Sequence, residues 1–133
     1  MIAIICIDDN NGMIFNNRRQ SRDKTIIERI IRISEGSTLW MNKYSVKLFP
    51  DNDNIYVSDN FLSECKENEF IFVENSSLLP VEAKITKLIV FKWNCSYPYD
   101  VILDIDIEKM KLVSVDDFEG NSHEKITMEV YER

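Results

Sequence analysis

Residues 37–49 decide the fold, and they read Ser-Thr-Leu-Trp-Met-Asn-Lys-Tyr-Ser-Val-Lys-Leu-Phe. Residues 38–41 combine β-branched, aromatic and apolar side chains, which predicts a short strand. Residues 45–49 predict a short helical piece, and Pro50 ends it because proline lacks the N–H that would continue a helix. A strand that runs into the start of a helix is typical of α/β proteins, so we expect an α/β sheet.

The chain before this stretch predicts one central strand and one helix. Residues 2–7 form a continuous apolar run, typical of a strand that is buried on both faces of a mostly parallel sheet. Residues 8–12 carry turn-forming side chains, and residues 16–20 continue as a polar loop. Asp23 can cap a helix that ends near Gly36. Isoleucines recur on this helix at helical spacing, at Ile26, Ile30 and Ile33.

The chain after this stretch predicts further strands and a terminal hairpin. We expect strands at 54–58, 70–73 and 88–91, a weaker one at 101–103, and one helical turn around Phe61. Two segments in which apolar and polar residues alternate predict an antiparallel C-terminal hairpin with one solvent-exposed face. In this hairpin we expect Met110, Leu112 and Val115 to face Ile126, Met128 and Val130. The order predicts a single α/β domain over residues 1–133. Its mixed sheet is mostly parallel, with an antiparallel C-terminal hairpin and few helices.

Composition excludes several classes of protein. The chain of 133 residues is 44% hydrophobic and 29% charged, which is typical of one globular domain. Its net charge of −7 argues against a nucleic-acid-binding protein, which needs a basic face against phosphates. No run approaches the roughly 20 apolar residues of a membrane span, so we expect no membrane association. Three cysteines without close spacing predict neither a disulfide framework nor a metal site, and a reducing cytoplasm is the expected location.

Three other groups bear on function. The basic run at residues 18–24 predicts either a solvated loop and helix start or an anion site. Trp93, Tyr97 and Tyr99 predict either a packed loop or a binding edge, because exposed aromatic side chains anchor interfaces. His123, the only histidine, lies in a polar turn and is expected to be solvated. We find no nucleophile elbow and no second histidine for a catalytic triad.

The combination of these segments resembles the dihydrofolate reductase family. The resemblance rests on the strand order, on Leu39-Trp40-Met41 and Ile55-Tyr56-Val57-Ser58, and on the C-terminal pattern, and it spans nearly the whole chain. It implies a dihydrofolate reductase-like fold that would use NADPH to reduce dihydrofolate. The chain is shorter than typical members. The missing length falls between Val57 and Leu88, where the family has its cofactor-binding helices.

The resemblance also implies that the catalytic acid is missing. The family places a buried carboxylate on its first helix, to bind the pterin and assist its protonation; that position falls near Ile26, with Asp23 and Glu28 flanking it. A threonine on a later strand bonds that acid, and its position falls near Phe91. Losing both polar partners avoids an unpaired buried group, which costs about 1–3 kcal/mol. The implied substrate cleft is apolar and is lined by Ile5, Ile7, Ile26, Ile30 and Phe91.

The cofactor positions are altered as well. Where the family has glycine-arginine-x-threonine to hold cofactor phosphates, this chain has Asn42-Lys43-Tyr44-Ser45. Where the family has adjacent glycines after a later strand, this chain has Glu74-Asn75-Ser76-Ser77, and Glu74 brings negative charge. The arginine that holds the glutamate tail of folate falls in the acidic stretch 51–53. The matching candidates for NADPH contacts are Lys43, Ser45, Ser58 and Ser76.

Three hypotheses follow. In the first, the chain keeps the fold of a dihydrofolate reductase, has lost the reaction, and acts as a binding or structural module. In the second, it is an active NADPH-dependent reductase of dihydrofolate or another pterin, with Asp23 or Glu28 handling the proton. In the third, the apolar cleft takes a small, flat, uncharged ligand other than folate. The first hypothesis also allows the chain to bind a protein partner.

Overall fold

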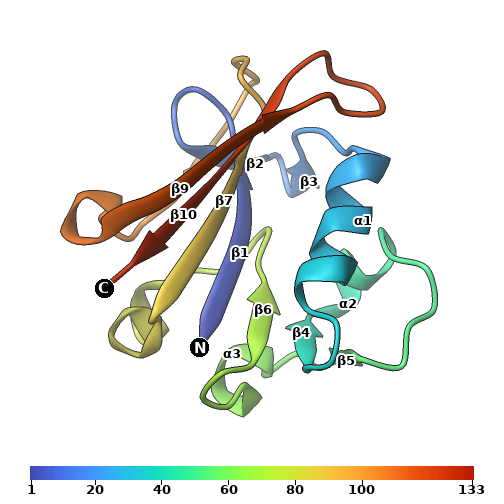
Figure 1. Cartoon of the computed structure of the whole chain (residues 1–133), viewed down its shortest axis with the longest axis vertical. Coiled ribbons are helices and arrows are strands. Elements are labelled where there is room, and N and C mark those ends of the chain that lie inside the picture. Colours follow the sequence, from blue (N-terminus) through green and yellow to red (C-terminus); the bar gives the residue numbers. More distant parts are fainter.

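A mixed sheet of seven strands forms the centre of the computed structural model, which describes all residues from 1 to 133 (Figure 1). The strand order is β5-β4-β6-β1-β7-β10-β9. The five strands from β5 to β7 run parallel, and the last two pair antiparallel. The bounds are β1 Ile2–Ile7, β4 Leu39–Met41, β5 Ile55–Val57, β6 Phe70–Phe72, β7 Lys87–Lys92, β9 Lys111–Phe118 and β10 Ile126–Glu132. This arrangement confirms the predicted α/β fold, mostly parallel with an antiparallel C-terminal hairpin.

Strand β1 lies in the middle of the sheet, between β6 and β7, as its apolar run predicts. Successive side chains of a strand point to opposite faces. Ile4 therefore packs in the core on one face, whereas Ala3, Ile5 and Ile7 pack in the core on the other. All four are fully buried, which explains why this strand has no polar alternation.

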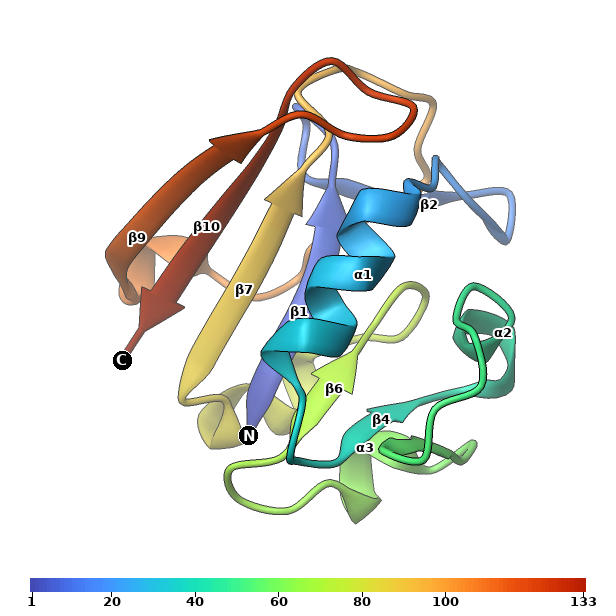
Figure 2. The ribbon, with the colours of Figure 1, turned by 45° about the vertical axis from the view of Figure 1, so that its right-hand side comes forward.

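Helix α1, Lys24–Ile33, covers the first face of the sheet (Figure 2). Asp23 caps its start by accepting a hydrogen bond from the backbone N–H of Thr25, which confirms the predicted cap. Ile26 and Ile30 are buried against Ile4 and its neighbours, and each buried isoleucine contributes about 1.5–3 kcal/mol. None of the helices has the length and apolar character needed to cross a lipid bilayer.

Short helical pieces and a loop cover the second face. Phe61 of α3, Phe61–Glu64, is buried there, which confirms the predicted helical turn. The connector around Pro80 forms a 3₁₀ helix, Leu79–Lys84, and a second 3₁₀ helix covers Ile107–Lys109. Leu103 and Ile105 complete this core.

Helix α2, Lys43–Val46, begins two residues before the predicted position. The reason is Asn42, whose side-chain oxygen accepts a hydrogen bond of 3.0 Å from the backbone N–H of Ser45 and so caps the helix early. The early start adds Lys43 and Tyr44 to the helix, and Ser45, helical as predicted, is completely buried.

A second, three-stranded sheet contradicts the expectation of a simple loop after β1. It has the order β3-β2-β8, with β2 at Gly12–Phe15, β3 at Arg18–Arg19 and β8 at Val101–Ile102. Asn16 and Asn17 adopt positive φ between β2 and β3, which lets the chain reverse within two residues. The weaker strand predicted at 101–103 forms as Val101–Ile102 and pairs in this sheet. This small sheet places residues 18–22 beside the start of α1.

The C-terminal hairpin is expected to expose only one face to solvent, and its outer strand does not follow this prediction. Strand β9 is exposed along both faces, including Leu112, Val113 and Val115, because no element covers it beyond β10 (Figure 1). The predicted facing residues also differ, since Leu112 pairs with Tyr131 and Val115 with Glu129. An irregularity between Val130 and Tyr131 shifts the register.

Candidate functional site

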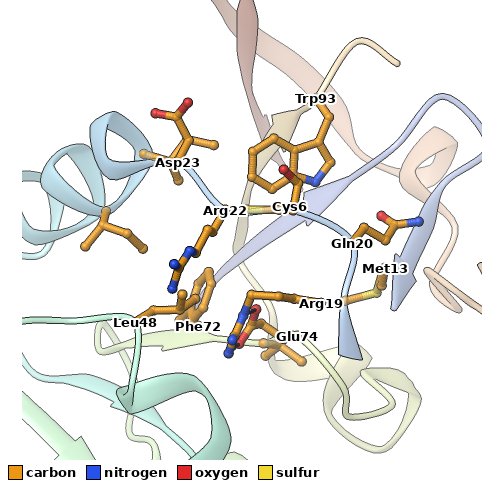
Figure 3. Close-up of a pocket in the computed structure, with 14 residues that line it drawn as sticks. Cys6, Met13, Arg19, Gln20, Arg22, Asp23, Leu48, Phe72, Glu74 and Trp93 are labelled. Carbon is orange, nitrogen blue, oxygen red and sulfur yellow. Dashed lines mark hydrogen bonds and ion pairs between the residues drawn. The ribbon is translucent and has the colours of Figure 1, made fainter. Parts of the chain in front are cut away.

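A small cavity lies between the start of α1, strand β1 and the end of β6 (Figure 3). Cys6, Phe72 and Trp93 line it together with Ile26 of the helix. Its volume is about 20 Å³. A single water fits in a cavity of this size, whereas sites for small molecules usually enclose roughly 300–1,000 Å³. The cavity in this state therefore does not accommodate a pterin ring.

An ion pair closes one side of the cavity. Glu74 accepts hydrogen bonds from Nε and Nη2 of Arg19, at 2.9 and 3.1 Å, and from Oγ of Ser45 at 2.8 Å. Arg19 also stacks over the ring of Tyr44, 4.3 Å from its centroid. Only 22% of the Arg19 side chain and 10% of the Glu74 side chain are exposed. Such a bidentate, partly buried pair fixes the orientation of the Glu74 carboxylate, which already accepts three hydrogen bonds.

Asp23 lies on the other side of the cavity and has no exposed side-chain surface. Its carboxylate points away from the cavity (Figure 3). It accepts five hydrogen bonds, from the backbone N–H of Thr25, Asn121 and Ser122, from Oγ of Ser122, and from Nδ1 of His123. Burial by itself raises the pKa of Asp23, but these hydrogen bonds outweigh it and hold the pKa well below its usual range. Asp23 is therefore an ionised acceptor.

Gly120 allows the loop at 120–123 to close over Asp23. A Cβ at this position would lie 2.5 Å from Oδ2 of Asp23 and 2.7 Å from Cδ1 of Ile126, so no side chain fits there. The close approach brings the N–H groups of the loop onto the carboxylate. The start of α1 and the loop before β10 are thus joined through one buried acid.

His123 is largely buried and is not the solvated loop histidine that the sequence predicts. Its side chain is only 11% exposed and packs on Trp93, with ring centroids 4.7 Å apart. Nδ1 lies 3.0 Å from Oδ2 of Asp23, and Nε2 lies 3.1 Å from both Oγ of Ser21 and the hydroxyl of Tyr97. The absence of a second histidine is therefore no argument against a serine-histidine-aspartate arrangement. For Trp93 and Tyr97, the interpretation as a packed loop is the one that holds.

Asp8 organises the neighbouring loops. It is buried and accepts hydrogen bonds from the backbone N–H of Tyr97, Gly12 and Asn10, and from the side chain of Gln20. Burial alone raises the pKa of Asp8, and the hydrogen bonds lower it below its ordinary value. This second buried acid fixes the loop that carries Tyr97 beside His123.

The five predicted cleft residues do not form one cleft. Ile26, Ile30 and Phe91 share a core on the α1 face, but Ile5 and Ile7 lie on the opposite face, because residues of β1 alternate. Of the five, only Ile26 lines the cavity, and the β1 residue that lines it is Cys6. The expectation of a cleft lined by all five residues is wrong.

The four predicted cofactor contacts do not line the cavity either. Lys43 is exposed and pairs with Asp59 at 3.7 Å, and Ser58 donates to Glu64 at 2.8 Å. Ser45 is bonded to Glu74, and Ser76 is half-buried. Glu28, one of the two predicted acids, is exposed on α1.

A basic hollow opens next to the cavity, with a volume of about 590 Å³. Every side chain that lines it carries a hydrogen-bond donor: Arg18, Arg19, Ser21, Arg22, Tyr44 and Ser122. Arg18 and Arg22 take part in no ion pair. Because the whole chain has a net charge of −7, this concentration of arginine is a local exception, and the basic run at 18–24 forms a positively charged surface.

Comparison of the sequence with models of known protein families and with curated proteins gave no match.

Proposed function

We propose that this chain is a dihydrofolate reductase-like protein that has kept the fold and lost hydride transfer, and that it acts as a binding or structural module. The observation that carries the proposal is the state of the cavity beside α1. Its volume of about 20 Å³ accommodates neither a pterin nor a nicotinamide, and hydride transfer requires both in contact. The parallel sheet with its antiparallel C-terminal hairpin agrees with the fold that the resemblance implies.

The residues at the position where the dihydrofolate reductase family has its catalytic acid support the loss of the reaction. Ile26 and Phe91 are both buried in one apolar core, with no polar group left between them for a pterin. Replacing both partners of a buried polar pair by apolar side chains of suitable shape can be nearly neutral for stability. The core around Ile26 and Phe91 therefore needs no acid to satisfy a buried partner.

The residues at the position where the family binds the phosphates of its cofactor give independent support. Glu74 places a carboxylate there, and Arg19 and Ser45 are already bonded to it. A phosphate would have to displace Glu74 and would meet its negative charge. We therefore expect NADPH to bind weakly or not at all.

The alternative is an active reductase in which Asp23 handles the proton. Proton donation to a pterin requires a carboxyl group that is protonated at working pH. Asp23 instead has a pKa well below its usual range, and both its oxygens accept hydrogen bonds from the protein. Glu28 is exposed and lies outside the cavity; with Asp23 it lines a separate hollow of about 490 Å³ between α1, residues 47–50 and the loop at 121–122. The low pKa of Asp23 and its full set of hydrogen bonds favour the first proposal.

Ligand titration tests the proposal. We expect no thermal stabilisation by NADPH or dihydrofolate up to millimolar concentration, and no decrease in NADPH absorbance when both are present. A ligand at 100 times its Kd would raise the free energy of unfolding by about 2.7 kcal/mol, so binding is easily seen. Stabilisation by sub-millimolar NADPH, or turnover that falls in Asp23→Asn or Glu28→Gln, would contradict the proposal.

A further inference from the structure

We propose that Ser21, His123 and Asp23 form a nucleophilic centre that cleaves carboxylic esters carrying an anionic group. This inference does not depend on the resemblance to a reductase, because Ser21 and Asp23 lie at the polar edge of the cavity and His123 lies outside it. It rests on three side chains from two distant segments that are connected in the order acid, imidazole, hydroxyl.

The hydrogen bonds assign a role to each group. Asp23 is ionised and can only accept, so Nδ1 of His123, 3.0 Å away, carries the proton between them. With the proton on Nδ1, Nε2 has one lone pair, which faces Oγ of Ser21 and the hydroxyl of Tyr97, each at 3.1 Å. Asp23 is a positioning residue, and His123 is the general base for the hydroxyl of Ser21. Trp93 fixes the plane of the ring from one side.

Ser21 is accessible to a ligand. It is half-buried and lines both the small cavity and the basic hollow of about 590 Å³. Arg18 and Arg22 line the same hollow and form no ion pair. A carboxylate or phosphate group of the substrate is the natural partner for these guanidinium groups. The substrate class is therefore an ester with a negative charge away from the scissile bond.

The reaction proceeds in two balanced steps. Oγ of Ser21 forms a bond to the ester carbonyl carbon, its proton moves to Nε2 of His123, and that proton passes to the leaving alkoxide as the carbon–oxygen bond breaks. Water then attacks the acyl-serine, gives its proton to Nε2, and releases the carboxylic acid as Oγ of Ser21 regains the proton. Arg22, adjacent to Ser21 and lining the same hollow, is the donor available to the carbonyl oxygen as it gains charge, which leaves Arg18 for the anionic group of the substrate.

Tyr97 shares the same imidazole nitrogen. Its hydroxyl also lies 3.1 Å from Nε2, so it competes with Ser21 for the single lone pair. Burial raises the pKa of Tyr97, which keeps its hydroxyl protonated as a donor. Removing this hydroxyl leaves Nε2 to Ser21 alone. Tyr97→Phe should therefore retain or increase reactivity at Ser21, whereas a purely structural network predicts no reactivity in either protein.

Covalent labelling tests the proposal on the unmodified protein. The full chain is incubated with a fluorophosphonate, and the modified residue is identified by peptide mass spectrometry. We expect one adduct per chain, at Ser21, and no adduct in the heat-denatured protein. The exposed Ser63 serves as an internal control. Absence of label at Ser21 in the folded protein, or labelling of Tyr97 instead, overturns the proposal, and no variant has to fold for this result.

Hydrolysis of 4-nitrophenyl esters tests the substrate class. Mono-4-nitrophenyl glutarate, which is anionic, is compared with the neutral 4-nitrophenyl acetate. We expect a higher kcat/KM for the glutarate, and a loss of about 100-fold or more in Ser21→Ala and His123→Asn, with Ser63→Ala unchanged. Unchanged hydrolysis in Ser21→Ala overturns the catalytic role. Equal rates for both esters overturn the role of the arginines. Binding of NADPH is irrelevant to either result, so this proposal and the proposed function fail separately.

Discussion

Glu74 and Asp23 border the same cavity from opposite sides, and the protein compensates their charges differently (Figure 3). Glu74 faces a cation, because Arg19 bonds it twice. Asp23 forms no ion pair with a lysine or an arginine. Its carboxylate mainly accepts hydrogen bonds from backbone N–H groups at the start of α1 and in the loop at 121–122. The charge of Glu74 depends on the position of one long side chain, whereas the charge of Asp23 is held by backbone groups that are part of the fold. We therefore expect Asp23 to contribute more to stability.

Among the variants that test this comparison, Asp23→Asn should lower the stability of the protein most. The amide nitrogen cannot accept hydrogen bonds, so at least one buried donor near it loses its partner. Hydrogen bonds to charged groups contribute about 1.5–3 kcal/mol each, and we expect the free energy of unfolding to fall by about 3 kcal/mol. Urea denaturation measures it, with the exposed Asp53→Asn as the control. A loss below about 0.5 kcal/mol would mean that the loop at 120–123 does not need the charge.

Glu74→Gln should have a smaller effect. The amide oxygen of the introduced side chain would still accept a hydrogen bond, but Arg19 would lose its counter-ion in a partly buried site. We expect a decrease of about 2 kcal/mol in the free energy of unfolding, below the roughly 3–5 kcal/mol of fully buried pairs. A double-mutant cycle with Arg19→Met isolates the pairwise term. If Glu74→Gln costs more than Asp23→Asn, the comparison above is reversed.

The pH dependence of stability should report on Asp23. The pKa of Asp23 is lowered in the folded protein, so its contribution is complete above the usual carboxyl pKa of about 4 and decreases as the pH falls towards the folded pKa. The slope approaches about 1.4 kcal/mol per pH unit for one proton. Urea denaturation between about pH 5 and pH 2.5 should therefore show a smaller slope for Asp23→Asn than for the unmodified protein. Identical slopes would show that another carboxylate, such as Asp8, dominates.

The smallest effects should come from the serines that bond each acid. Ser45→Ala removes a buried hydroxyl that donates to Glu74 and should cost about 1 kcal/mol. Ser122→Ala removes one hydroxyl but keeps the backbone N–H on Asp23, so a cost of about 0.5 kcal/mol is expected. Thermal melts of the two variants side by side give the ranking. A larger loss in Ser122→Ala would place the stabilising contact in the side chain and not in the backbone.

The elements that can be predicted from the sequence depend on local patterns. The apolar run of β1, the cap at Asp23 and the antiparallel hairpin each lie within one segment, and the structure confirms them, although the hairpin does not have the predicted exposed face or facing residues. The early start of α2 depends on the side chain of Asn42, and β2 and β3 depend on positive φ at Asn16 and Asn17. These are conformations of single residues, which hydrophobic periodicity does not reveal.

The candidate site is much harder to predict, because its contacts join distant segments. Asp23 and His123 are 100 positions apart, and Arg19 and Glu74 are 55 apart. The basic run at 18–24 is a usable signal, since it contains Ser21 and both unpaired arginines. The prediction that Ile5 and Ile7 line the cleft ignores the alternation of β1, which places them on the far face. That error is avoidable from the sequence.

Strand β9 has a consequence for how this protein behaves in concentrated solution. Its outer backbone groups have no neighbouring strand, and Val115, 55% exposed, lies near the middle of that border. Unprotected borders of this kind recruit further chains into growing sheets. Here the charged side chains of Lys111, Asp116 and Asp117 flank the exposed valines, and they would have to lose water before another strand could pair there. The net charge of −7 on each chain adds a general repulsion between approaching molecules, and high salt will weaken that repulsion.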